Sequence, residues 1–296
     1  MDCVAMFTSG KPKRLAFVSS TSALDIDHYV QTDDLEGSRE GLATGYRQSK
    51  WASEYIVREA GKRGLTGAIT RPGYVTGNPE SSISVTDDFL VCLWKGCLQV
   101  AAGPALANMA NQVPVTRVSR IVVVSALHPP PPPAGAYAIG VAQVTSHPRL
   151  TMDQWAGALE AYGYVAPRVP YAEWSARLAA YVSNDDGGAA AGKLPPFHFV
   201  TSDLPAGTVA PELDDANTAA APRAYCGQTD VSHDPITESA VTVETIGKHL
   251  AYLVAVGFLP PPPVKGRGSL GCLSLGLKGY RRWGSLEAGL WSRDRL

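Results

Sequence analysis

The chain has 296 residues, a formal net charge of −1 at pH 7 and 45% hydrophobic residues. This length accommodates one large or two small globular domains, and this share of apolar residues is sufficient to bury a core. Because acidic and basic residues nearly cancel, the overall charge gives no support to nucleic acid or a membrane surface as the partner.

The N-terminus shows no sign of a targeting segment. It lacks a basic run followed by an apolar stretch, and the longest apolar stretches are too short to span a bilayer. We therefore expect a soluble, cytoplasmic protein that binds neither a membrane nor nucleic acid. The five cysteines include no Cys-x-x-Cys pair and no two histidines lie at metal-ligand spacing, so we expect reduced thiols and no metal site.

The first predicted element is a strand over 14–20, whose sequence RLAFVSS is apolar without polar alternation and ends in hydroxyls. Such a run is typical of a strand that is buried on both faces of a parallel sheet. A helix follows that carries Tyr46 and Lys50 and is closed by GKRG at 61–64. The sequence LTGAITRPG at 65–73 predicts a strand and a turn, so the three elements form a β-α-β unit.

Helices and strands are predicted to alternate further along the chain, over residues 87–144. We expect a helix over 87–99, because the two aspartates at its start suit the dipole of a helix N-terminus. The stretch at 112–127 predicts a short strand followed by a helix that Thr116 caps. The five prolines at 129–133 predict an extended loop, and AYAIGVAQV at 136–144 predicts another strand.

The second half of the chain is predicted to be mainly helical. Thr151 and Gln154 form a capping-box pattern that opens a helix to about residue 162. Further helices are expected near 171–182 and 242–256.

Three features of this pattern fall at one place in the expected fold. Hydroxyls at 19–21 end the first strand, Tyr46 and Lys50 share one face of the next helix, and 71–73 ends the second strand. Because parallel strands end at one edge, where open α/β folds bind ligands, we expect these residues to lie close together. A Tyr-x-x-x-Lys spacing alone often arises by chance on a helix surface. In this setting, however, a phenol beside a lysine cation suits general acid catalysis, and a serine hydroxyl suits holding a substrate oxygen.

The same residues resemble the extended short-chain dehydrogenase/reductase family, whose triad is Ser or Thr, Tyr and Lys. The chain is similar in particular to the C-terminal thioester-reductase domain of fungal L-2-aminoadipate reductases, and more loosely to the reductase domains of nonribosomal peptide synthetases and carboxylic acid reductases. The resemblance extends from about residue 10 to residue 260. The segments that carry it are FVSSTSALD, GYRQSKWASEYIVREAGKRGL, RPGYVTG, TDDF, VPV, HPRLT, TSDLP and APELDDAN.

The resemblance implies a function and a set of site residues. NADPH would reduce a thioester held on the phosphopantetheine of a carrier-protein domain to an aldehyde, as in the aminoadipate-semialdehyde step of lysine biosynthesis. Tyr46 would donate the proton, Lys50 would tune its acidity and contact the ribose, and Ser20 would polarise the carbonyl. Ser19 and Thr21 stay open for that last role. The residues implied to bind the cofactor are Ser19, Tyr46, Lys50, Arg71, Pro72, Gly73 and Tyr74.

The chain departs from the family pattern at its start. In a doubly wound dinucleotide-binding fold, a strand, a glycine-rich turn and a helix N-terminus that receives the pyrophosphate should precede residue 14, and only MDCVAMFTSGKPK does. We therefore expect an α/β fold with a partial Rossmann-type doubly wound parallel sheet, with the first mononucleotide-binding half missing, and a smaller helix-rich substrate domain. The alternative to a working reductase is a truncated, inactive remnant or a scaffold that binds a carrier domain.

The expected parts follow one another along the chain. Residues 1–145 form the C-terminal part of the NAD(P)-binding reductase domain, 146–260 the helix-rich substrate and carrier side, and 261–296 a basic tail of low order. A Gly-x-Gly-x-x-Gly pattern at 266–271 follows a proline run instead of a strand, so we do not assign it to phosphate binding.

Overall fold

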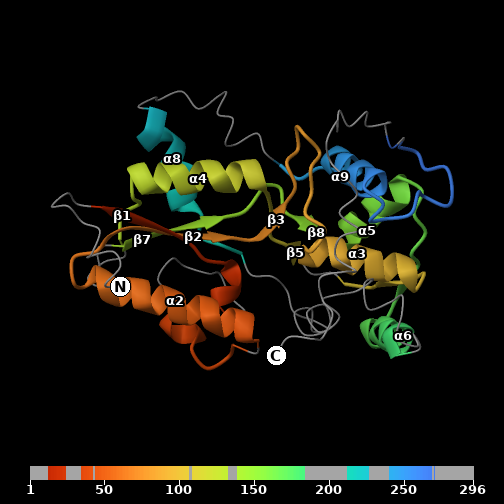
Figure 1. The fold of residues 1–296 in the computed structure, drawn as a ribbon, viewed down its shortest axis with the longest axis horizontal. Helices are drawn as coiled ribbons and strands as arrows, with labels where there is room; N and C mark the ends of the chain where they lie inside the picture. The colour runs from red at the N-terminus through yellow and green to blue at the C-terminus, as the bar shows by residue number, and fades with distance from the viewer. Residues whose placement is uncertain are drawn as a thin grey trace, which may run out of the picture. The chain divides into compact units, whose positions relative to one another are not determined.

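The computed structural model of the chain describes residues 13–24, 35–42, 44–106, 109–132, 139–183, 212–226, 240–268 and 270 (Figure 1). The chain divides into two compact units, each built from three separate stretches of sequence. The first, which we call the sheet unit, takes residues 1–79, 107–152 and 207–242. The second, which we call the helical unit, takes residues 80–106, 153–206 and 243–296.

A parallel sheet of three strands lies at the centre of the sheet unit, in the order β1-β2-β7. Its strands are β1 (Arg14–Val18), β2 (Thr66–Pro72) and β7 (Ile139–Val144). All of β7 and all but the first residue of β2 are buried, as in strands covered on both faces. The expectation that β1 is also buried on both faces is wrong, because β1 is an edge strand of the described sheet whose residues alternate between exposed and half-buried. Val18 pairs with Thr70, and Pro72 pairs with Val144, so the strands end near one edge. The structure confirms the predicted α/β fold with a parallel sheet.

Helices cover both faces of this sheet (Figure 1). On one face lies α2 (Gly45–Gly61), which packs against Val141. On the other face lie α4 (Val115–Leu127) and α8 (Ala216–Cys226), which pack against Ala142. Because neighbouring residues of a strand point to opposite faces, Val141 and Ala142 place these two cores on opposite sides of β7.

Two short strand pairs complete the sheet unit. They are β3 (Tyr74–Thr76) parallel to β6 (Gln112–Pro114), and β5 (Met109–Ala110) antiparallel to β8 (Leu150–Thr151). β3 begins two residues after the end of β2, so it continues the chain beyond the carboxyl edge of the main sheet.

Two local features of the sheet unit differ from the sequence-based expectations. The helix α4 begins at Val115 with Pro114 before it, so Thr116 lies inside the first turn and the expectation that it caps the helix is wrong. Pro114 sets this boundary because its ring fixes φ, here −62°, while its ψ of 141° keeps it extended at the end of β6. The sequence also does not predict α8, which contains Pro222, a residue type that disfavours helix interiors.

Tryptophans form the centre of the helical unit. Its elements are the helices α3 (Phe89–Gln99), α5 (Met152–Ala161), α6 (Tyr171–Ser183) and α9 (Val243–Ala255), and the short parallel strands β4 (Gly103–Pro104) and β9 (Arg168–Val169). The four helices confirm those predicted. The ring of Trp94 in α3 lies against that of Trp155 in α5, and Trp174 of α6 is fully buried. Burial raises the pKa of the Cys97 thiol to about 12, which keeps this cysteine protonated at neutral pH.

The residues of the two units alternate along the chain, so that neither unit is one continuous stretch. The chain leaves the sheet unit after residue 79, forms α3, and returns at residue 107. It does so because α3 packs with α5, which follows much later in the sequence, as the contact of their tryptophan rings shows. Stretches that are neighbours in sequence therefore belong to different units.

Asp88 caps the N-terminus of α3, as expected for an aspartate before this helix. Its carboxylate accepts hydrogen bonds from the main-chain N–H groups of Leu90 at 2.9 Å and Val91 at 3.4 Å. Burial raises the pKa of the Asp88 carboxyl from 3.8 to about 6, because desolvation of the charged form outweighs these hydrogen bonds.

Replacing Asp88 with Asn should flatten the pH dependence of stability in the acidic range. A carboxyl with a raised pKa in the folded state stabilises the fold fully below its unfolded pKa of 3.8, and this contribution is lost as the pH rises through about 6. Asn still caps a helix but does not titrate. The free energy of unfolding of Asp88→Asn, measured by urea denaturation, should therefore fall less between pH 4 and pH 7 than that of the parent. Equal slopes would contradict the raised pKa.

Candidate active site

The hydroxyl groups that follow β1 lie at the carboxyl edge of the sheet. The main-chain N–H of Ser19 donates to the Thr70 carbonyl of β2 at 2.8 Å, which extends the strand pairing by one residue. Ser20 then caps the short helix η1 (Thr21–Ala23), and its Oγ accepts a hydrogen bond from the Ser22 N–H at 3.1 Å. Because a hydroxyl has one proton and two lone pairs, the Ser20 proton stays available for an acceptor on a ligand.

The side chain of Ser19 is buried, and its Oγ has no hydrogen-bond partner among the residues that the structure describes. Buried hydroxyls are nearly always paired, so an unpaired one at a ligand-binding edge is the kind of group that a bound ligand completes. Ser19 therefore fits the cofactor contact expected of it, which stays a prediction.

The helix α2 presents Tyr46 and Lys50 beside the end of β1. The side chain of Thr44 caps this helix just before them. Lys50 Nζ donates to the carbonyl of Val18, the last residue of β1, at 3.1 Å, and lies 5.7 Å from the centre of the Tyr46 ring. The Tyr46 side chain is 40% exposed and so is accessible to a ligand. The structure thus brings Tyr46 and Lys50 to the strand that leads directly into Ser20.

The Arg71 side chain, in contrast, is held by an internal partner. It pairs with Glu54 of α2, with Nη2 2.7 Å from Oε2 and Nε 2.9 Å from Oε1. Neither side chain is exposed to solvent. A contact between Arg71 and a cofactor would therefore come from its main chain. Sequence reasoning missed Glu54, although its place four residues after Lys50, on the same helical face, is a signal that could have found it.

The turn expected at the end of β2 is not formed: Gly73 alone joins Pro72, the last residue of β2, to Tyr74, the first residue of β3. The Gly73 N–H donates to the Val144 carbonyl at 3.0 Å, and the Tyr74 N–H donates to the Asn111 carbonyl at 2.7 Å. The main chain of Asn111 passes so close that a Cβ added to Gly73 would lie 1.8 Å from its carbonyl oxygen. Only glycine fits at this close approach, at the same edge where Ser20 follows β1.

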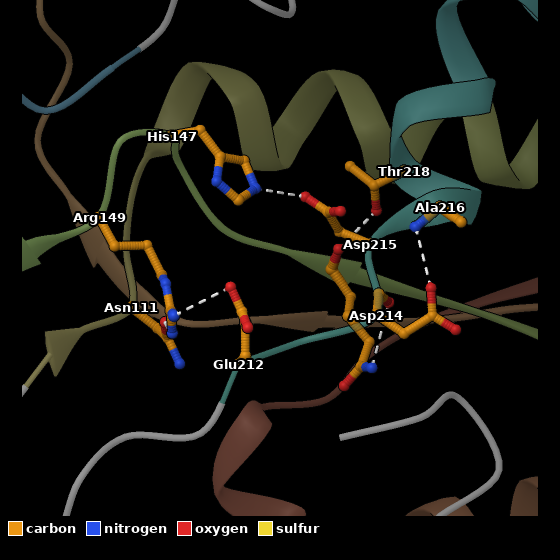
Figure 2. A network of polar contacts seen from close by, with 9 residues as sticks. Asn111, His147, Arg149, Glu212, Asp214, Asp215, Ala216 and Thr218 are labelled. Carbon is orange, nitrogen blue, oxygen red and sulfur yellow. Dashed lines mark hydrogen bonds and ion pairs between the residues drawn. The ribbon is translucent and has the colours of Figure 1, made fainter. Parts of the chain in front are cut away.

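A network of polar side chains fastens residues 212–218 to the end of β7 (Figure 2). Nε2 of His147 lies 2.7 Å from Oδ2 of Asp215. The Thr218 hydroxyl donates to the main-chain carbonyl of Gln143 at 2.6 Å. These contacts join the start of α8 to the strand that it covers and to the loop after that strand.

Arg149 connects this network to the segment where β2 passes into β3. Its guanidinium donates to Oδ1 of Asn111 at 3.2 Å and lies 3.5 Å from a carboxylate oxygen of Glu212 (Figure 2). Because the Asn111 carbonyl accepts from the Tyr74 N–H, the network supports the segment at 72–74 that we expect to contact the cofactor. Sequence reasoning missed these partners, and the signal was the opposite charge of the HPRLT and APELDDAN segments.

Two further properties of the described residues concern membranes and metals. None of their helices is long and apolar enough to cross a membrane. No cluster of three or more His, Cys, Asp or Glu side chains among them is arranged to hold a metal ion.

The parallel sheet covered on both faces, with Ser20, Tyr46 and Lys50 at its carboxyl edge, is typical of Rossmann-like NAD-binding reductase domains. Residues 2–122 match the NAD-binding family described as "Male sterility protein". The crystal structure of the terminal R domain from the myxalamid PKS-NRPS biosynthetic pathway superposes with a TM-score of 0.71 at 25% identity, over 88% of this chain and 63% of that one. The reductase (R) domain of a nonribosomal peptide synthetase from Mycobacterium tuberculosis shares the fold, with a TM-score of 0.62 at 19% identity, over 82% and 60%.

The chain is homologous to the C-terminal reductase domain of fungal L-2-aminoadipate reductase, which confirms the resemblance seen in the sequence. It is 48% identical to the L-2-aminoadipate reductase large subunit of Penicillium chrysogenum over 284 residues, which cover 90% of this chain and 20% of that protein. It is 42% identical to the L-2-aminoadipate reductase of Schizosaccharomyces pombe over 273 residues, which cover 87% and 18%. The chain therefore spans about a fifth of the length of these curated relatives.

Gly73→Ala should destabilise the fold, because its Cβ would overlap the Asn111 carbonyl oxygen and force the main chain to move. We expect the free energy of unfolding to fall by about 1–3 kcal/mol, as at other overpacked sites. Gly157→Ala is the matched control, since Gly157 lies in α5 with no atom within 4 Å of the added Cβ, and alanine there should stabilise by about 0.5–1 kcal/mol. Urea denaturation measures both, and a stabilised Gly73→Ala chain would contradict the close approach.

Proposed function

We propose that this chain reduces an acyl thioester, held on the phosphopantetheine of a carrier-protein domain, to an aldehyde with NADPH. The observation that carries the proposal is the link between α2 and β1. Lys50 Nζ donates to the Val18 carbonyl at 3.1 Å, two residues before Ser20 and one helical turn after Tyr46. The homology to the reductase domain of fungal L-2-aminoadipate reductase supports it.

Each residue of the triad has a task in this reaction. The Ser20 hydroxyl, which accepts from the Ser22 N–H, donates its own proton to the carbonyl oxygen of the thioester. The Tyr46 phenol passes a proton to the same oxygen as negative charge develops on it. The Lys50 ammonium stabilises the phenolate that remains.

The groups at the carboxyl edge of the sheet fit the nicotinamide and ribose end of NADPH, which supplies the hydride when it is bound. The groups that would hold it are the Ser19 hydroxyl, which has no partner among the described residues, the Lys50 ammonium and the main chain of residues 71–74. In the described ranges, no glycine-rich turn joins a strand to a helix N-terminus, so we assign no residue to the pyrophosphate.

The products follow from the atom balance of the reaction. One hydride and one proton added to the thioester carbonyl give a thiohemiacetal. Its C–S bond then breaks and the hydroxyl proton passes to sulfur, so that the carrier thiol is restored and an aldehyde leaves. With the aminoadipyl chain, which the names of the relatives suggest, this aldehyde is aminoadipate semialdehyde, an intermediate of lysine biosynthesis.

Calorimetric titration of the purified chain with NADPH tests whether the cofactor binds. A reductase should show saturable binding with a micromolar Kd, which corresponds to about −8 kcal/mol. The titration is repeated with a carrier domain that bears phosphopantetheine but no acyl group. Binding of the carrier without any binding of NADPH would refute the reductase and favour a carrier-binding scaffold.

Tyr46→Phe should remove the proton donor and leave the fold intact. We expect the rate of aldehyde formation from an aminoadipyl-phosphopantetheine thioester to fall by about 10²–10⁴-fold, the usual contribution of a positioned general acid. Tyr55→Phe is the matched control, because Tyr55 lies on the same helix with a similar exposure of 39% and stacks on Trp51. Equal rates in the parent and Tyr46→Phe would refute the assigned role.

A further inference from the structure

Glu54 and Arg71 form an ion pair without solvent exposure inside the sheet unit. Arg71 Nη2 lies 2.7 Å from Glu54 Oε2, and Nε lies 2.9 Å from Oε1 and 3.1 Å from Oε2. Two nitrogens of the guanidinium bond to the carboxylate, and we call this arrangement the fork. Because both groups are planar, the fork fixes their relative orientation as well as the distance between them. The pair therefore holds α2 against β2 in a defined geometry.

Glu54 shares a helical face with the two triad residues of α2. It lies four residues after Lys50 and eight after Tyr46, and residues four apart lie one above the other on a helix. Tyr46, Lys50 and Glu54 therefore form one stripe along α2. A rotation or slide of this helix moves all three side chains together.

α2 is also held by other contacts, such as the hydrogen bond from Trp51 Nε1 to the Leu35 carbonyl at 2.8 Å, but Leu35 lies outside the main sheet. The packing of Val57 on Ile69 is apolar and has no preferred direction. The hydrogen bond from Lys50 to the Val18 carbonyl has a direction, but a long and flexible side chain makes it. Of these three contacts with the main sheet, the planar Arg71 guanidinium, bound to Glu54 through two nitrogens, restricts the rotation of α2 most.

We propose that Glu54 and Arg71 are positioning residues that set the rotation of α2, so that Tyr46 and Lys50 face the carboxyl end of β1. Arg71 is suited to this role because it belongs to β2, whose main chain pairs directly with β1. The helix and the sheet are thereby joined one turn beyond Lys50. The catalytic part of this inference rests on the proposed reductase function, whereas its structural part does not.

An apolar double variant separates positioning from stability. Removal of one partner leaves a buried charge and endangers the fold, whereas replacement of both partners by apolar residues is often neutral or stabilising. Glu54→Leu combined with Arg71→Met should therefore fold with a melting temperature near that of the parent, but without the directional fork. Arg71→Lys is the second variant, because it keeps the charge and loses the planar fork.

Acetylation of Lys50, followed by mass spectrometry, reports the position of α2 without any need for activity. In the parent, the hydrogen bond to the Val18 carbonyl protects the Lys50 ammonium. Both variants should raise the acetylation rate of Lys50 several-fold, while Lys62, exposed at the end of the same helix, keeps its parental rate. Glu59→Gln, which removes an exposed carboxylate from the same helix, is the matched control and should leave the Lys50 rate unchanged.

Turnover gives the second readout. Both variants should lower aldehyde formation by about 10²-fold, the effect of a misplacement of roughly 1 Å, whereas Glu59→Gln keeps the parental rate. Folded variants with parental Lys50 acetylation and parental turnover would overturn the positioning role, and so would the failure of both variants to fold. A parent without any reductase activity would count against the proposed function alone, because the acetylation rates would still decide the position of α2.

Discussion

Two opposite charges that are shielded from solvent have to stay together, because either one alone would lose both water and its partner. Glu54 and Arg71 impose this constraint on the sheet unit, since one belongs to α2 and the other to β2. β2 is also the central strand of the main sheet, paired with β1 on one side and β7 on the other. The same pair thus connects the helix that carries Tyr46 and Lys50 to the strand at the centre of the main sheet.

The first β-α-β unit and the place of the triad were predictable from the sequence because local and global signals agree there. The apolar run before Ser19, the helix that carries Lys50 and the apolar run before Pro72 each specify one element. The order of these elements then requires a parallel sheet, and a parallel sheet brings their ends to one edge. No long-range information beyond this topology was needed to bring Lys50 to the end of β1.

The partner of Arg71 was not predictable in the same way. An arginine at the end of a strand, next to a proline and a glycine, has the appearance of a ligand-binding group, and a glutamate within a polar helix has the appearance of a solvated one. Only the packing of α2 on the sheet buries both and turns them toward each other. The interleaving of the two units is equally invisible in the sequence, because α3 finds its partner Trp155 about 60 residues later.

During synthesis, neither unit can form from one continuous stretch of chain. β1, α2 and β2 are made early, but β7 follows only after α3 and α4, and α8 only after α5 and α6. The apolar side of α4 that packs with Ala221 therefore stays uncovered until α8 has been made, about 100 residues later. Such distant contacts slow folding and leave apolar surface open to self-association until the later elements have been made.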